Sequence, residues 1–208
     1  MRNEQGFDEW AETYDESVSK NEQEESYPFA GYHTVLQTIY KTVTTGKAPA
    51  VLDIGFGTGV LTKKLYDAGC RISGIDFSRK MIDTAQPKMP KATLVQADFS
   101  KGVPPQLAGQ TYDDIISTYA FHHLTDEQKA VFLRELLQTL NPGGRILIGD
   151  VMFPTDKERQ ACREKSGSTW DENEHYLDIA SFTKQFPEAS FHRISFCAGI
   201  LTFTKDEK

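Results

Sequence analysis

The sequence has little that would place the protein in a membrane or in an oxidising compartment. No apolar run among its 208 residues approaches the roughly 18 residues that are needed to cross a bilayer. The first ten residues, MRNEQGFDEW, lack the apolar stretch of a signal peptide. We therefore expect a cytoplasmic protein that has no membrane partner.

Cysteine is also sparse. The three cysteines, Cys70, Cys162 and Cys197, are odd in number, far apart in the chain and not arranged in any CxxC pair. This pattern favours reduced thiols over a disulfide framework, and it lacks the spacing of a structural zinc site. We expect no bound metal.

The chain has no excess of basic residues. Its formal net charge is -7, and residues 1–30 carry all of it, with nine acidic and two basic side chains. The remainder of the chain is electrically balanced. Because a protein that binds nucleic acid needs a basic patch against the phosphates, we expect no nucleic-acid partner.

The length and the 38% hydrophobic content are those of one folded domain, and short apolar runs alternate along it with segments of helical spacing. This alternation predicts an α/β fold with a doubly wound, mostly parallel sheet and helices on both of its faces. The predicted strands cover residues 50–54, 71–75, 92–96, 114–118 and 145–151. The predicted helices cover residues 7–18, 29–43, 60–68, 78–85 and 126–140. Beyond residue 151 we expect helices over 154–186, with a break at 166–168, and two closing strands over 191–203.

Polar or glycine-rich segments follow four successive predicted strands. Gly55, Gly57 and Gly59 follow the first strand, Asp76 ends the second and Asp98 lies near the end of the third. Residues 117–123, STYAFHH, end the fourth. In an open α/β sheet, ligands bind beyond the carboxyl ends of the strands, so these segments predict one binding site.

The glycine spacing helps to identify the ligand. A strand that turns at once into a helix beside a bound ligand needs residues without a Cβ. Dinucleotide sites use GxGxxG, whereas here Val60 occupies the position of the third glycine, which argues against a nicotinamide-dependent oxidoreductase. Asp76 lies 21 residues after Gly55, a separation suited to a carboxylate that accepts ribose hydroxyls. Asp53, just before the glycines, is expected to order the loop by accepting backbone N–H groups.

These motifs together resemble those of class I S-adenosylmethionine-dependent methyltransferases, of the small single-domain bacterial type. The resemblance runs in order through residues 7–15, 51–59, 74–78, 96–99, 112–118, 117–126 and 140–145. It implies a Rossmann-like, seven-stranded sheet and a single methyltransferase domain over residues 1–208. Within it, residues 1–45 would form an N-terminal helical lid, 46–151 the cofactor-binding core, and 152–208 variable helices and closing strands.

The resemblance also implies a role for each matched residue. S-adenosylmethionine would bind as cofactor and leave as S-adenosylhomocysteine. Gly55, Gly57 and Gly59 would line its methionine and adenosine parts, and Asp76 would hold its ribose. Asp98 and the Phe99 backbone would contact adenine, with Phe77 beside the ring. Thr118 and Tyr119 would lie near the methionine end, and Trp10 and Tyr14 would close over the cofactor.

The methyl acceptor is less well determined by the sequence. A neutral body without any RNA-binding appendage favours a small-molecule substrate. His122 and His123 follow the fourth strand, where an acceptor would approach the methyl group, and His122 is the preferred candidate for a general base. A protein that binds the cofactor without catalysis, such as a sensor, remains an alternative, and the sequence specifies no oligomeric state.

Overall fold

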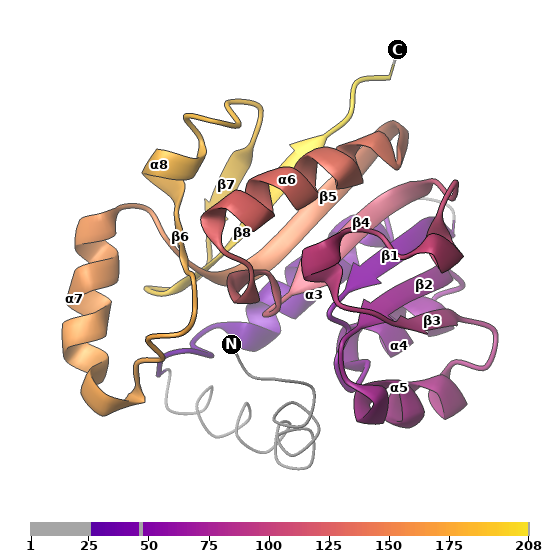
Figure 1. The fold of residues 1–208 in the computed structure, drawn as a ribbon, viewed down its shortest axis with the longest axis horizontal. Coiled ribbons are helices and arrows are strands. Elements are labelled where there is room, and N and C mark those ends of the chain that lie inside the picture. Colours follow the sequence, from indigo (N-terminus) through magenta and orange to yellow (C-terminus); the bar gives the residue numbers. More distant parts are fainter. Residues whose placement is uncertain (1–25, 46–47, 208) are drawn as a thin grey trace.

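The computed structural model describes residues 26–45 and 48–207, and it shows a central sheet covered by helices on both faces (Figure 1). The strand order is β3-β2-β1-β4-β5-β8-β7, and a short strand β6 pairs with β5 beside this path. The strands are β1 Ala50–Ile54, β2 Arg71–Asp76, β3 Thr93–Gln96, β4 Tyr112–Thr118, β5 Leu140–Phe153, β6 Leu177–Asp178, β7 Ser190–Arg193 and β8 Ala198–Thr204. The α-helices are α3 Tyr32–Val43, α4 Val60–Asp67, α5 Arg79–Ala85, α6 Asp126–Gln138, α7 Asp156–Ser166 and α8 Ile179–Phe182.

The doubly wound, mostly parallel sheet is confirmed. Strands β1 to β5 are parallel, whereas β8 is antiparallel to both β5 and β7. One core cluster joins the sheet to α3, α4 and α5, and a second joins its other face to α6 and α8. The strand order reverses between β1 and β4, so the loops that follow these strands diverge to opposite faces and leave a crevice between them.

Local sequence signals explain several element boundaries. The Ser78 hydroxyl accepts the Met81 N–H at the start of α5. Thr125 and Gln128 form a reciprocal capping box that starts α6 directly after the turn at the end of β4. These caps fix the points at which the chain leaves the carboxyl edge of the sheet.

The prediction was wrong at the start of the fifth strand. Helix α6 ends at Gln138, and β5 already begins at Leu140 instead of Arg145. The pairing with β4 passes from Tyr112–Leu140 to Asp114–Arg145, so residues 141–144 form a bulge within the strand. Asn141 donates a hydrogen bond to Asp113 at 2.7 Å, and this tie holds the bulge against β4.

Residues 154–186 are less helical than their sequence suggested, since α7 and α8 are separated by a long connection that contains β6. The predicted helix over 7–18, with Trp10 and Tyr14, lies outside the described residues. Within the described ranges, no helix combines the length and the apolar character needed to cross a bilayer.

Gly149 on β5 allows α3 to lie directly on the sheet. A Cβ built at Gly149 would be 2.3 Å from Cγ1 of Val35 and 2.9 Å from Cδ1 of Ile39. Any side chain at this position would therefore push α3 away from β5. Gly149 therefore sets how closely α3 approaches β5. This matters for function because α3 also contributes residues to the site described below.

We predict that Gly149→Ala lowers the free energy of unfolding by about 1–3 kcal/mol, because the added methyl group overpacks the contact with α3. Val131→Ala is the control. Val131 is 67% exposed on α6, so its truncation should change stability by less than about 0.5 kcal/mol. Urea unfolding of both variants measures the difference, and a Gly149→Ala protein as stable as the parent would contradict the packing argument.

Candidate active site

A cavity opens at the carboxyl edge of the sheet, where the strand order reverses. The loops that follow β1, β2, β3 and β4 form its walls, and α3 contributes Tyr32 and Leu36. Most of the predicted cofactor residues line it, namely Gly55, Gly57, Asp76, Phe77, Asp98, Phe99 and Thr118. The structure thus brings together residues that are up to 63 positions apart in the chain.

The loop after β1, which carries Gly55, Gly57 and Gly59, packs closely at Gly55 against the turn after β4. Gly55 has a φ of +70°, and a Cβ there would be 2.3 Å from Cβ of Ala120 in the turn after β4. Gly57 also has a positive φ, of +56°, and faces open space. Gly59 precedes α4 as its N-cap and does not line the cavity with the other described residues. The loop therefore needs glycine at 55 for packing, and at 57 its backbone is open to a ligand.

Asp76 ties the glycine loop to the end of β2. Its Oδ2 accepts the Gly57 N–H at 2.8 Å, and its Oδ1 accepts the Ser78 N–H at 2.9 Å. A carboxylate has about four lone-pair sites, which suits it to accept ligand hydroxyls as well as backbone N–H groups. The expectation that Asp53 orders this loop by accepting backbone N–H groups was wrong, because its Oδ2 accepts the Thr62 hydroxyl and its Oδ1 has no hydrogen-bond partner among the described residues.

Asp98, just after the end of β3, also lines the cavity. Its Oδ1 accepts the Ser100 N–H at 3.0 Å. Burial would raise the pKa of Asp98, but the hydrogen bonds from Ser100 and the charge of Lys101 outweigh burial and lower it. The carboxylate is therefore ionised at neutral pH and offers acceptors to the cavity. Behind it, Phe99 stacks on Phe132 of α6, which fixes the loop on the sheet.

Aromatic side chains cover the end of the cavity beyond β4. Tyr119 has a positive φ of +51°, unusual for a residue with a Cβ, and its N–H donates to the Gly149 carbonyl at 2.9 Å. Its ring lies 5.0 Å from that of Tyr32 and 5.5 Å from that of Phe29. Tyr32 and Phe29 were not predicted as site residues, although their place in the aromatic run YPFAGY was a usable signal.

His122 lies in a second cavity, which adjoins the first. Tyr119 and His123 belong to the walls of both, and the other lining residues of the second cavity include Tyr27, Phe29, Asp171, Glu174 and Tyr176. Its aromatic rings pack closely, since Tyr27 and Tyr176 contact edge to face at 5.9 Å and their hydroxyl groups are hydrogen-bonded. Hence the predicted base faces a separate pocket beside the predicted cofactor site.

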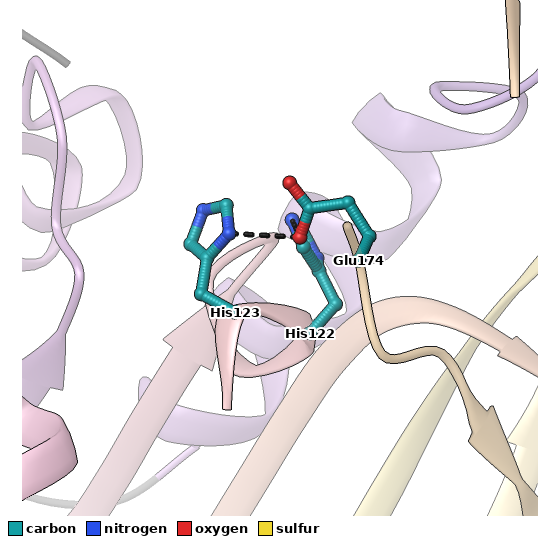
Figure 2. A group of neighbouring side chains, drawn as sticks. All are labelled: His122, His123 and Glu174. Carbon is teal, nitrogen blue, oxygen red and sulfur yellow. Dashed lines mark hydrogen bonds and ion pairs between the residues drawn. The ribbon is translucent and has the colours of Figure 1, made fainter. Parts of the chain in front are cut away.

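The imidazole of His122 is held by a buried carboxylate. Its Nδ1 lies 2.6 Å from Oδ1 of Asp150, and its backbone N–H donates to Oδ2 of the same residue at 3.0 Å. Nε2 lies 3.5 Å from Oε2 of Glu174, and Nδ1 of His123 lies 2.9 Å from that same oxygen (Figure 2). Asp150 and Glu174 were missed by sequence analysis. The acid that follows the apolar run of β5 was a signal for Asp150, whereas Glu174 lies in a segment without a pattern.

These contacts shift the pKa values of the two histidines in opposite directions. Burial would lower the pKa of His122, but the carboxylates of Asp150 and Glu174 outweigh it and raise that pKa. For His123, burial and the neighbouring His122 lower the pKa, although Glu174 opposes them. His122 is therefore the ring that takes up a proton more readily, and His123 stays neutral.

Comparisons with known proteins identify the family. Residues 51–144 match the model of a methyltransferase domain. An uncharacterized methyltransferase of Oceanobacillus iheyensis is 34% identical over 193 residues, with 89% of this chain and 87% of the relative covered. A second, of Geobacillus kaustophilus, is 38% identical over 198 residues, with 89% and 88% covered. The chain belongs to the class I S-adenosylmethionine-dependent methyltransferases.

Solved structures show the same fold at low sequence identity. The magnesium protoporphyrin IX methyltransferase of Synechocystis PCC 6803 with bound SAH has a TM-score of 0.67 and 20% identity, with 86% of this chain and 85% of that chain covered. The DhpI–SAH complex has a TM-score of 0.71 and 16% identity, with 97% and 94% covered. This methyltransferase thus shares its Rossmann-like fold with both of these proteins.

Asp53 of the methyltransferase is fully buried beneath the glycine loop. Its Oδ2 accepts the Thr62 hydroxyl at 2.7 Å, whereas its Oδ1 has no hydrogen-bond partner among the described residues. Burial raises the pKa of Asp53 to about 7. The nearby negative charge of Asp76 also raises this pKa, whereas the hydrogen bond from Thr62 lowers it. The folded protein therefore holds a proton here that the unfolded chain releases at acid pH.

We predict that this carboxyl makes the protein less stable as the pH rises from about 4 to about 7. In that window the folded state binds more protons than the unfolded state, so unfolding becomes easier with rising pH. Asp53→Asn removes the effect and should raise stability at pH 8 by up to about 4 kcal/mol. Urea unfolding at pH 5 and pH 8, without cofactor, measures it. Asp83→Asn, on the exposed face of α5, should retain the parental pH slope, and an equal slope in Asp53→Asn would contradict the assignment.

Proposed function

We propose that the protein transfers the methyl group of S-adenosylmethionine to a small-molecule acceptor, with the donor in the first cavity and the acceptor in the second. The observation that supports this proposal is that the two cavities share a wall. Tyr119 and His123 border both spaces, so a donor and an acceptor would meet there. The second cavity is bordered by side chains of two distant segments, around Tyr27 and around Glu174, which suits a compact molecule better than a polymer.

The donor cavity has a suitable group for each part of S-adenosylmethionine. Asp76 would accept the ribose hydroxyls while it keeps its two backbone bonds. Asp98 and the Phe99 backbone would contact the adenine ring, with Phe77 beside it. Thr118 and Tyr119 would lie at the methionine end, near Gly55 and Gly57. Gly59 would contribute indirectly, as the N-cap residue that starts α4, and not as a residue of the cavity wall. The closure of Trp10 and Tyr14 over the donor remains a prediction on residues outside the described ranges.

Methyl transfer from a sulfonium needs mainly alignment and the exclusion of water, because the donor is already activated. An oxygen or nitrogen acceptor must also lose a proton. Nδ1 of His122 is held by Asp150, so Nε2 is the ring atom that can take the proton on the side of the second cavity. The carboxylate of Asp150 would stabilise the imidazolium that results, as in other histidine–carboxylate pairs.

Ligand binding tests the proposed donor site. Calorimetry should show binding of S-adenosylhomocysteine and no binding of NADH. Asp76→Ala should weaken S-adenosylhomocysteine binding at least about 100-fold, because hydrogen bonds to a charged group contribute about 1.5–3 kcal/mol each. Asp83→Ala, which removes an exposed carboxylate of α5, is the matched control and should bind normally. Unchanged affinity in a folded Asp76→Ala protein would disprove the ribose assignment.

Turnover tests the proposed role of His122. His122→Ala should lower turnover on the acceptor by about 10²–10⁴-fold, the range typical of a lost general base. It should leave S-adenosylhomocysteine affinity unchanged, since His122 does not border the donor cavity. His175→Ala, an exposed histidine of the Glu174 segment, serves as control in both assays. Turnover equal to that of the control would exclude His122 from the chemistry.

A further inference from the structure

Three ligand-type atoms converge where the second cavity meets the turn after β4. Figure 2 shows the rings of His122 and His123 beside the carboxylate of Glu174. One ring nitrogen of His122, one ring nitrogen of His123 and one carboxylate oxygen of Glu174 all lie within 4.8 Å of one another. The histidines are consecutive residues, whereas Glu174 comes from the segment that leads into β6, so the fold itself brings the three together.

The distances from the shared oxygen suit a metal ion. Oε2 of Glu174 lies 2.9 Å from Nδ1 of His123 and 3.5 Å from Nε2 of His122. Two ligands each about 2.1 Å from an ion are about 3.0 Å apart at a right angle and about 3.4 Å apart in a tetrahedron. An ion could therefore replace the proton between His123 and Glu174 after small side-chain shifts.

The surroundings of His122 resemble the support that metal-bound histidines receive. Such a histidine commonly donates its second ring N–H to a carboxylate, which fixes the tautomer and directs the other nitrogen to the metal. Asp150, which is 2% exposed, contacts Nδ1 of His122 at 2.6 Å and so leaves Nε2 directed toward Glu174.

The charge around the cluster also favours a cation. Asp150 and Glu174 bring two largely buried carboxylates, with side-chain exposures of 2% and 14%. Lys129 is the buried cation nearby, and it is bonded to Asp126 and to the His175 carbonyl. No lysine or arginine of the described residues forms a salt bridge with Glu174. The site therefore has more negative than positive fixed charge.

We propose that His122 Nε2, His123 Nδ1 and Glu174 Oε2 bind one divalent transition-metal ion, whose remaining coordination positions face the second cavity. Two histidines and one carboxylate with open positions form a ligand set that Zn²⁺ and Fe²⁺ both accept. The expectation of no metal relied on cysteine spacing, which carries no information about a site built from histidine and glutamate.

This inference rests on the proposed function only for what the ion would do. An acceptor bound at an open position would be oriented toward the donor, and its hydroxyl or amine pKa would fall because the ion stabilises the deprotonated form. With the ion bound, Nε2 of His122 is a ligand, so the ion takes over the activation that His122 performs in the metal-free protein.

The test is zinc binding to the full-length, tag-free protein after removal of metals by a chelator. Calorimetry without any S-adenosyl compound should show one Zn²⁺ per chain. His123→Ala and Glu174→Gln should each weaken binding at least about 100-fold, more than the 10–100-fold typical for loss of an outer-shell partner. Asp150→Asn should fall within that 10–100-fold range. Circular dichroism verifies that each variant is folded.

His175→Ala and Glu172→Gln are matched controls, since both residues are exposed in the same segment and lie outside the cluster. They should bind Zn²⁺ like the parent. Zinc binding that is absent, or that is equal in the Glu174→Gln and control proteins, would overturn the site. Zinc binding without S-adenosylhomocysteine binding would instead refute the proposed function and leave the metal site standing.

Discussion

The interaction on which the proposed donor site depends is made by the carboxylate of Asp76. Through one group it holds the Gly57 N–H of the loop after β1 and the Ser78 N–H at the start of α5. The two turns that flank the cavity are therefore fixed relative to each other before any ligand binds. A ligand hydroxyl that reaches Asp76 meets a preorganised acceptor, which reduces the entropic cost of binding.

Close packing at two glycines fixes the other side of the crevice in the same way. Gly55 leaves no room for a side chain against Ala120, and Gly149 lets α3 descend until Tyr32 reaches Tyr119. The turn after β4 is thus held by its neighbours on both sides. The same turn carries His122 and His123, so the packing that shapes the donor cavity also sets the position of the groups that would act on the acceptor.

The core of the fold could be predicted from the sequence because its signals are local. Apolar runs that end in glycine or aspartate mark β1, β2 and β3, and they also place Asp76 and Asp98 at one edge. The bulge at residues 141–144 could not be predicted, since NPGG also terminates helices. Glu174 could not be found either, because its role arises only when the segment before β6 folds over the turn after β4. Contacts between distant irregular segments leave no periodic signal in the sequence.

We propose that the two adjoining cavities hold a methyl donor and a small acceptor. The most direct measurement is incubation of the protein with isotope-labelled S-adenosylmethionine and a metabolite extract, followed by mass spectrometry. We expect a labelled methyl group on a low-molecular-weight compound, and no such product with Asp76→Ala. Transfer of the label only to protein or nucleic acid added to the same assay would contradict it.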